Sequence, residues 1–229
     1  MLIDHVRYPG RKHDYRALVV RPKVALTSPG ILLLHDRWGL TRETEAIAER
    51  LAHEGYVVMV PDLYDGQLPK DDGQARHMMH LLGHQEGEEE VKLALHWLRN
   101  QAYTKAHRTA IIGFEHYGTL GILAATSPKF PPSAIVVFYA PVQGILDRLG
   151  MVYSAVQGHF AARDKYVPSA DVDAFQKALQ DAGVVHEIYV YENVGHDFMN
   201  PRSENYDEGT ATQAWQRMLT FLDAHVRTL

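Results

Sequence analysis

The feature that most constrains the fold is an alternation of short, continuously apolar runs with amphipathic helical segments. Several runs, such as 31–35 and 134–139, are apolar at consecutive positions, which is typical of strands covered on both faces. The strand-like runs are 14–21, 31–35, 57–61, 109–114, 134–139, 154–160 and 187–191, and the helical segments are 42–54, 88–100, 170–182 and 211–226. This alternation predicts an α/β fold, in which helices cover both faces of a mostly parallel sheet.

Two helix ends can be predicted from local signals. Glu88, Glu89 and Glu90 are suited to the positive N-terminal end of the helix at 88–100. Gly183 directly follows the segment at 170–182 and is a suitable C-terminal cap.

Length and composition predict one domain that spans residues 1–229. The chain has 229 residues, without a repeat or a low-complexity linker. It contains no cysteine, which excludes disulfides, thiolate metal ligands and a thiol nucleophile. Its 23 Lys and Arg against 28 Asp and Glu give a net charge of −5, which argues against a nucleic-acid partner.

The apolar runs are too short to cross a membrane. The longest are strand-sized, at 31–34 and 134–142, whereas a spanning helix needs about 18 consecutive apolar residues. The first residues lack the basic flank and apolar stretch of a signal peptide. We therefore expect no membrane partner and a cytoplasmic protein, either a monomer or a homodimer.

Reactive side chains follow four of the predicted strands. They lie in the segments 35–39, 113–118, 161–168 and 191–196. Ligands of parallel sheets bind outside the carboxyl ends of the strands, so these segments should meet. Their order, a turn before a helix, then Asp164, then His196, is that of α/β-hydrolases. A chance arrangement remains an alternative, because turns favour Asp and surfaces tolerate His.

The chain resembles the dienelactone hydrolase family over nearly its whole length. The resemblance rests on residues 32–40 (LLLHDRWGL), 52–64 (AHEGYVVMVPDLY), 113–114 (GF), 163–168 (RDKYVP) and 191–200 (YENVGHDFMN). It implies an α/β-hydrolase fold with a mostly parallel sheet of about eight strands. It also implies hydrolysis of a small ester or lactone without a cofactor, often of a substrate that carries a carboxylate.

The resemblance assigns roles to five positions. Asp164 and His196 match the acid and the histidine of the family's catalytic triad. Asp36 occupies the place of a glutamate that helps to activate the nucleophile. The backbone N–H groups of Arg37 and His116 correspond to the two donors of the oxyanion hole.

The nucleophile position departs from the family. Glu115 stands where the family has cysteine or sometimes serine, and Tyr117 replaces the glycine two residues later, while Gly118 is kept. The nucleophile turn needs small neighbours because its backbone is strained. Gly113 is small, but Tyr117 is not, which predicts a relaxed or re-aimed turn.

Three interpretations of Glu115 remain open. It could be a carboxylate nucleophile, which suits epoxides or carbon–halogen bonds better than ester carbonyls. Glu115 or His196 could instead activate a water molecule. In the third, Glu115 pairs with His196 or Arg37 and fills the oxyanion hole, which leaves a catalytically retired, ligand-binding protein. The resulting prediction is a hydrolase of a small ester, lactone or related molecule.

Three further residues are candidates for substrate binding. Trp38, next to an oxyanion donor, could form a wall of the pocket or simply belong to the core. Arg76 lies in a segment expected to overhang the pocket, where it could bind a substrate carboxylate or be merely exposed. Arg202 could bind an anion through two hydrogen bonds, or pair with the acidic C-terminal region.

Histidines at 77, 80 and 84 share one face of a possible helix. Their spacing would suit a metal ion, but no paired carboxylate motif accompanies them. We expect a solvated face or a pocket rim, with His80 the second candidate after Arg76 for the substrate carboxylate. The sequence thus predicts neither a metal nor a cofactor, and a small molecule as the partner.

Two carboxylates of the expected site are predicted to influence one another. If Asp36 and Glu115 approach closely, both cannot ionise without cost, and the pKa of one should rise. Arg37 or a protonated His196 nearby would oppose that rise.

Overall fold

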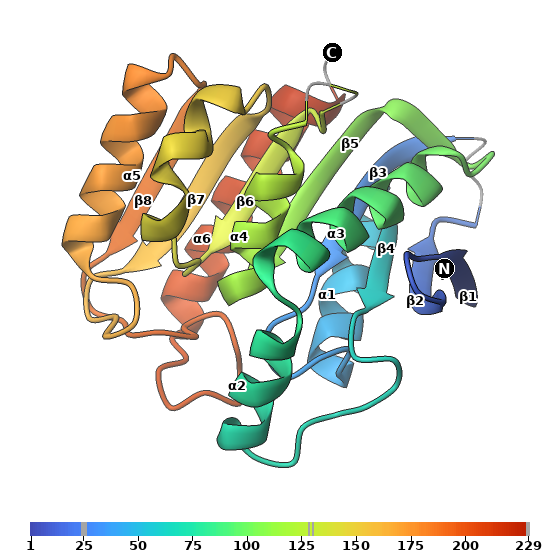
Figure 1. Cartoon of the computed structure of the whole chain (residues 1–229), viewed down its shortest axis with the longest axis horizontal. Coiled ribbons are helices and arrows are strands. Elements are labelled where there is room, and N and C mark those ends of the chain that lie inside the picture. The colour runs from blue at the N-terminus through green and yellow to red at the C-terminus, as the bar shows by residue number, and fades with distance from the viewer. Residues whose placement is uncertain (24–26, 128, 130, 228–229) are drawn as a thin grey trace.

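The computed structural model describes residues 1–23, 27–127, 129 and 131–227, and it contains an eight-stranded sheet (Figure 1). The strand order is β1-β2-β4-β3-β5-β6-β7-β8. β1 and β2 are antiparallel to their neighbours, and the pairs from β4 to β8 are parallel. The strands are β1 (Leu2–Pro9), β2 (Asp14–Arg21), β3 (Ser28–Leu34), β4 (Val57–Asp62), β5 (Thr104–Phe114), β6 (Ala134–Phe138), β7 (Ala155–Ala161) and β8 (His186–Tyr191). The predicted α/β fold and its mostly parallel sheet are confirmed.

Helices cover both faces of this sheet (Figure 1). They are α1 (Arg42–His53), α2 (Asp72–Leu81), α3 (His84–Arg99), α4 (Glu115–Ala124), α5 (Ser169–Asp181) and α6 (Glu208–Leu222), with a 3₁₀ segment η1 (Gln143–Met151) and a π-helical turn η2 (Asp223–Arg227). One apolar core holds the buried residues of α3, α4, α5 and η1, and a second holds those of α1 and α6. Among the described residues, no helix is both long and apolar enough to span a membrane.

The continuously apolar strands form because both of their faces are buried. In β3, Leu32 and Leu34 pack into the first core, while Ile31 and Leu33 pack into the second. Successive side chains of a strand point to opposite faces, so a strand between two helical layers needs apolar residues at every position.

Two local features differ from the sequence prediction. The edge strand β1 was not predicted, because polar residues such as Asp4 and Arg7 interrupt its apolar positions. Helix α3 begins at His84, so the prediction that Glu88, Glu89 and Glu90 form its start is wrong. Glu88 is instead buried in the second turn, where Arg148 of η1 donates a hydrogen bond of 2.7 Å to its carboxylate.

The turn from β5 into α4 requires two glycines in contact. A Cβ atom on Gly113 would lie 2.6 Å from the Cα atom of Gly118, and one on Gly118 would lie 3.0 Å from the Gly113 carbonyl oxygen. These distances leave no room for a side chain, and the obstructing atoms are backbone. The two glycines therefore let the first turn of α4 pack against the end of β5.

We predict that Gly113→Ala destabilises the fold by about 1–3 kcal/mol, the usual cost of inserting a methyl group where there is no space. The control is Gly144→Ala in η1, where nothing lies within 4 Å of the added Cβ atom. Chemical denaturation of both variants measures the difference. Equal stabilities would show that the contact between the glycines is not tight in solution.

Candidate active site

Glu115 occupies a sharp turn between β5 and α4. Its φ angle is 50°, in the left-handed region that side chains other than glycine rarely adopt. The prediction of a relaxed turn at Tyr117 is therefore wrong. Tyr117 points into the core, where its ring lies 4.7 Å from that of His35, and Gly118 provides the small residue that the turn needs.

The predicted acid and histidine come together with Glu115. The Nε2 atom of His196 lies 3.0 Å from Oε1 of Glu115, and its Nδ1 atom lies 2.7 Å from Oδ2 of Asp164. The other oxygen of Asp164 accepts hydrogen bonds from the backbone N–H groups of Tyr166 and Val167. Asp164 is thus held by its own loop, and it orients the imidazole toward Glu115.

The carboxylate of Glu115 also binds one of the predicted oxyanion donors. The backbone N–H of Arg37 donates a hydrogen bond of 2.9 Å to Oε2 of Glu115. The other predicted donor, His116, lies in the first turn of α4, where N–H groups lack partners within the helix. In this state the negative charge of Glu115 lies where a substrate oxyanion is expected.

Arg37 joins three carboxylates from different parts of the chain. Its guanidinium forms an ion pair with Glu115, and it donates hydrogen bonds of 2.9 Å to Asp197 and 3.1 Å to Asp72. The side chains of Arg37, Glu115 and Asp197 are largely shielded from water, whereas that of Asp72 is 43% exposed. Sequence reasoning missed Asp72 and Asp197; the position of Asp197 directly after the predicted catalytic histidine was the only signal.

The charges of Glu115 and His196 support one another. Burial raises the pKa of Glu115, but the hydrogen bond from His196 and the charge of Arg37 outweigh it and lower the pKa. Burial lowers the pKa of His196, yet its hydrogen bonds to Asp164 and Glu115 raise the pKa to about 9. At neutral pH the site therefore holds a carboxylate beside an imidazolium.

The predicted effect between carboxylates is confirmed at Asp36. Burial and the charge of Glu115 raise the pKa of Asp36 to about 7, although its carboxylate accepts a hydrogen bond of 2.8 Å from the Trp38 N–H. Burial and the same Glu115 charge also raise the pKa of Asp197.

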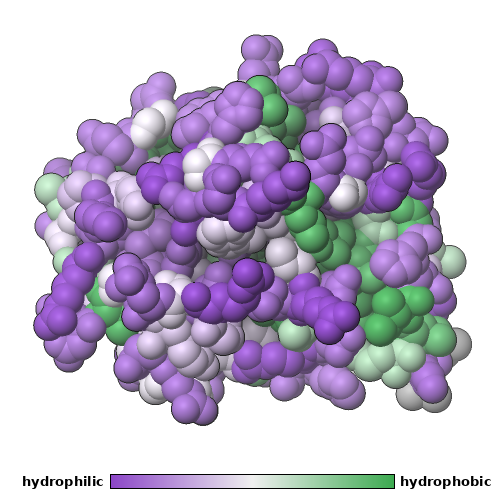
Figure 2. All heavy atoms as spheres, turned by 90° about the horizontal axis from the view of Figure 1, so that it is seen from below, coloured by the Kyte–Doolittle hydropathy of each residue, from purple (hydrophilic) through white to green (hydrophobic). Residues whose placement is uncertain are grey.

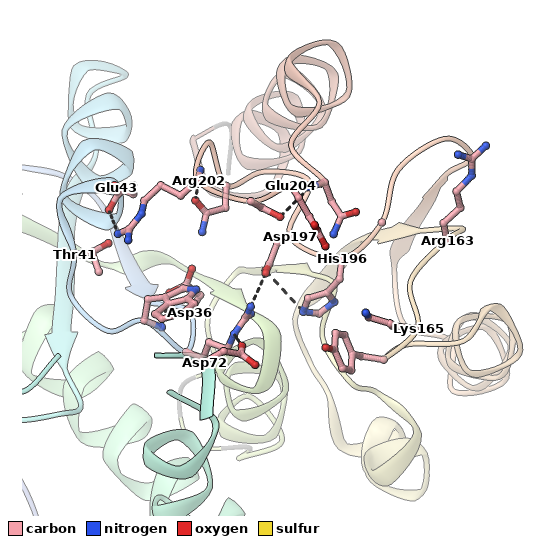
Figure 3. Close-up of a pocket in the computed structure, with 17 residues that line it drawn as sticks. Asp36, Thr41, Glu43, Asp72, Arg163, Lys165, His196, Asp197, Arg202 and Glu204 are labelled. Atoms are coloured by element: carbon pink, nitrogen blue, oxygen red, sulfur yellow. Dashed lines mark hydrogen bonds and ion pairs between the residues drawn. The ribbon is translucent and has the colours of Figure 1, made fainter. Parts of the chain in front are cut away.

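Two cavities meet at this cluster. The larger one, of about 600 Å³, is lined by Asp36, Trp38, Asp197 and Arg202 (Figure 3). The smaller one, of about 250 Å³, is lined by Glu115, His116, Arg76 and His80. Arg37, Asp72, Tyr166 and His196 line both cavities, and the surface on this side is mostly hydrophilic (Figure 2).

The remaining predicted residues lie around the cavities. Arg76 is half exposed and pairs with Asp72. Trp38 is partly buried, with the guanidinium of Arg37 5.3 Å from its ring centre. Trp38 thus lines the larger cavity and Arg76 the smaller one, and the predicted contact of Arg76 with a substrate carboxylate stays a prediction.

Arg202 lines the larger cavity from the loop that follows His196. The alternative that Arg202 pairs with the acidic C-terminal region is wrong. Its guanidinium lies 3.7 Å from the carboxylate of Glu43 in the first turn of α1 (Figure 3).

One group of side chains in the site has the composition of a metal centre. Ligand atoms of Glu115, His196 and Asp197 lie within 4.8 Å of one another. The guanidinium of Arg37 already pairs with both carboxylates of this group. Arg37 thus supplies the positive charge that an ion would bring.

A family model described as the dienelactone hydrolase family matches residues 15–226. The chain belongs to the dienelactone hydrolase family. The prediction of a hydrolase from this family is confirmed, and so is its α/β-hydrolase fold.

Individual relatives agree with this assignment. The chain is 28% identical over 221 residues to the "Putative carboxymethylenebutenolidase" of Aquifex aeolicus, covering 93% of this chain and 94% of that protein. It is 24% identical over 223 residues to the "Probable 2-oxo-3-(5-oxofuran-2-ylidene)propanoate lactonase" of a Bradyrhizobium species, covering 92% and 89%. A crystal structure titled as a "Putative Dienelactone Hydrolase" from Klebsiella pneumoniae superposes with a TM-score of 0.87 at 25% identity, covering 96% and 98%.

We predict that Glu115→Gln lowers the pKa of His196 from its value of about 9, because the amide no longer offers the imidazolium a negative charge. NMR titration of the His196 ring measures this shift. The matched control is Glu43→Gln, which removes a carboxylate from the rim of the larger cavity. An unchanged His196 pKa in Glu115→Gln would contradict the ion pair.

The same pair gives stability a pH dependence. The pKa of His196 is raised from 6.5 to about 9 in the folded state, so its stabilising contribution is complete below pH 6.5 and is lost as pH rises through 9. The free energy of unfolding should therefore fall as the pH rises from 6.5 through about 9. In Glu115→Gln this fall should be smaller.

Proposed function

We propose that the chain hydrolyses a small ester or lactone by direct attack of water, with Glu115 as the general base and His196 as the general acid. The observation that carries this proposal is the 3.0 Å contact between Oε1 of Glu115 and Nε2 of His196, two groups of opposite charge. A base that lacks a proton and an acid that holds one thus lie side by side at neutral pH.

The proton transfers follow from this arrangement. Glu115 takes a proton from water as the water oxygen bonds to the substrate carbonyl carbon. His196 then donates its proton to the leaving oxygen as the carbon–oxygen bond breaks. A proton passes from Glu115 to His196 across their contact and restores the starting state. Asp164 keeps the imidazole oriented throughout.

The same step releases the oxyanion donor. In the resting state Oε2 of Glu115 accepts the Arg37 N–H. Once Glu115 is protonated it is a weaker acceptor, so this N–H becomes available to the oxyanion that develops on the substrate. Because the lowered pKa of Glu115 makes it a weak base, we expect slow turnover, with a general-base contribution at the low end of about 10²–10⁴-fold.

Three observations support a small, anionic ester or lactone as the substrate. The family and the names of the two relatives point to lactones. The cavity at Glu115 has a volume of about 250 Å³, which suits a small molecule. Arg76 lines that cavity and Arg202 lines the adjoining one, which supports a substrate carboxylate that exchanges with their present partners, Asp72 and Glu43.

A second candidate function is displacement at a saturated carbon of an epoxide or a carbon–halogen compound, with Glu115 as the nucleophile. It is favoured by the strained φ of 50° at Glu115 together with the Arg37 N–H on Oε2. Oε1 would attack the carbon and form an alkyl ester on Glu115, as the carbon–halogen bond breaks and releases halide, or as the epoxide C–O bond breaks and its oxygen takes the proton of His196. That N–H would then stabilise the oxyanion formed when water hydrolyses this ester.

Kinetics on a panel of lactones, aryl esters, epoxides and haloacids distinguish these functions. We expect the wild type to hydrolyse lactones or esters, and Glu115→Gln to lower kcat by about 100-fold or more, since it removes the general base. Glu43→Gln, at the rim of the neighbouring cavity, should retain activity.

Three outcomes would contradict the water mechanism. Full activity in Glu115→Gln excludes a chemical role for the carboxylate. Incorporation of ¹⁸O into Glu115 during one turnover in labelled water establishes the covalent route instead. An inert wild type with esterase activity in Glu115→Cys identifies a retired, ligand-binding protein.

The pH profile separates the two mechanisms independently. If His196 is the acid, kcat/KM should fall as pH rises through about 9, where the imidazolium of the free enzyme loses its proton. If His196 must be neutral to activate water on an alkyl ester, kcat should rise with pH over its titration. Measurement from pH 6 to 10 with the best substrate of the panel decides between them.

A further inference from the structure

Three imidazoles from different helices gather beside the smaller cavity. His80 lies in the last turn of α2, His84 is the first residue of α3, and His116 is the second residue of α4. The ring centre of His116 lies 4.9 Å from that of His84 and 6.4 Å from that of His80. His80 and His116 also line the smaller cavity.

One ring nitrogen of His116 is buried without a partner. Burial lowers the pKa of His116 to about 4, and the nearby backbone carbonyl of Leu82 opposes that change. Among the described residues, Nε2 of His116 has no hydrogen-bond partner although it is buried, and the residue as a whole is 7% exposed. An Nδ1–H directed toward the Leu82 carbonyl leaves Nε2 unprotonated, which is the tautomer that a metal ligand requires.

The ring centres are near the separations of a metal centre, whereas the ligand atoms of the three histidines do not yet all lie within 4.8 Å of one another, the spacing that Glu115, His196 and Asp197 have. Two imidazoles that bind one zinc ion with bonds of about 2.0–2.1 Å have ring centres about 5 Å apart. The separation of His116 and His84 already matches this value. His80 must approach by roughly 1 Å, and its exposed side chain, like that of His84, is free to turn.

We propose that His80, His84 and His116 form a binding site for a divalent transition-metal ion such as Zn²⁺. His116 is the fixed ligand, because it is buried in the first turn of α4, whereas His80 and His84 are exposed. His80 and His84 complete the site from either side of the break between α2 and α3 at residues 82–83.

The site is separate from the Glu115, His196 and Asp197 group, because it shares no residue with it. Three imidazoles leave one position of a tetrahedral ion open. Since two of the ligands line the smaller cavity, this position would face the space that Glu115 also lines. The ion would also tie the end of α2 and the start of α3 to α4.

Titration of the purified protein with Zn²⁺ and with Co²⁺ in the absence of substrate tests the site. We expect one equivalent to bind, with Co²⁺ giving the absorption bands of a tetrahedral ion. His84→Ala and His80→Ala should each weaken binding by about 100-fold or more, the upper end of what loss of an outer partner costs. Both side chains are exposed, so neither variant should affect folding.

The matched control is His77→Ala, one turn earlier on α2, which should bind like the wild type. Long-range ¹H–¹⁵N spectra of the free protein should show His116 as the Nδ1–H tautomer, and Zn²⁺ should shift its Nε2 signal. Unchanged Zn²⁺ affinity in His84→Ala would overturn the proposal. So would binding that is lost in His77→Ala and that leaves the Nε2 signal of His116 unshifted. Because the titration uses no substrate, its outcome is independent of the proposed hydrolysis.

Discussion

The arrangement of the site depends on one cation, the guanidinium of Arg37. It holds Glu115 at the turn before α4, Asp197 in the loop after β8 and Asp72 at the start of α2. These three segments are far apart in the sequence and meet only at the carboxyl ends of the strands. A buried carboxylate without a partner is costly, and Arg37 offsets that cost at Glu115 and Asp197, while the half-exposed Asp72 adds a third contact.

The charges around Arg37 determine which groups of the site are protonated and can therefore act as an acid or as a base. Glu115 stays ionised because Arg37 and His196 both face it, and His196 stays protonated because Glu115 and Asp164 both face it. At Asp36 burial and the charge of Glu115 outweigh the Trp38 N–H and the charge of Arg37, and they raise the pKa to about 7. The charge state of each group is thus a property of the cluster rather than of the individual residue.

The fold class and the positions of Glu115, Asp164 and His196 after their strands could be predicted from the sequence, because both depend on local patterns. Continuous apolar runs reveal strands buried on both sides, and the order of Glu115, Asp164 and His196 along the chain follows from which strands they succeed. The side-chain partners of Arg37 could not be predicted in this way. They depend on the direction of a flexible side chain and on where α2 begins, 35 residues later.

The errors at Tyr117 and at the start of α3 have a common cause. In each case the prediction gave a structural role to one residue, whereas in the folded protein a residue nearby in the sequence has that role. Gly118 rather than position 117 makes the close contact with Gly113, and Gly83 rather than Glu88 marks the beginning of α3. A single sequence shows which residues are present, but not which neighbour lies within 3 Å of the backbone.

The bond between the Arg37 N–H and Oε2 of Glu115 makes the chain its own ligand. A group tethered to the protein competes at an effective concentration that a dissolved compound seldom reaches. Any molecule that uses this N–H must first displace the carboxylate, so its measured affinity is lower than its contacts alone would give. Compounds that leave the tethered carboxylate in place and occupy only the neighbouring cavities escape this competition.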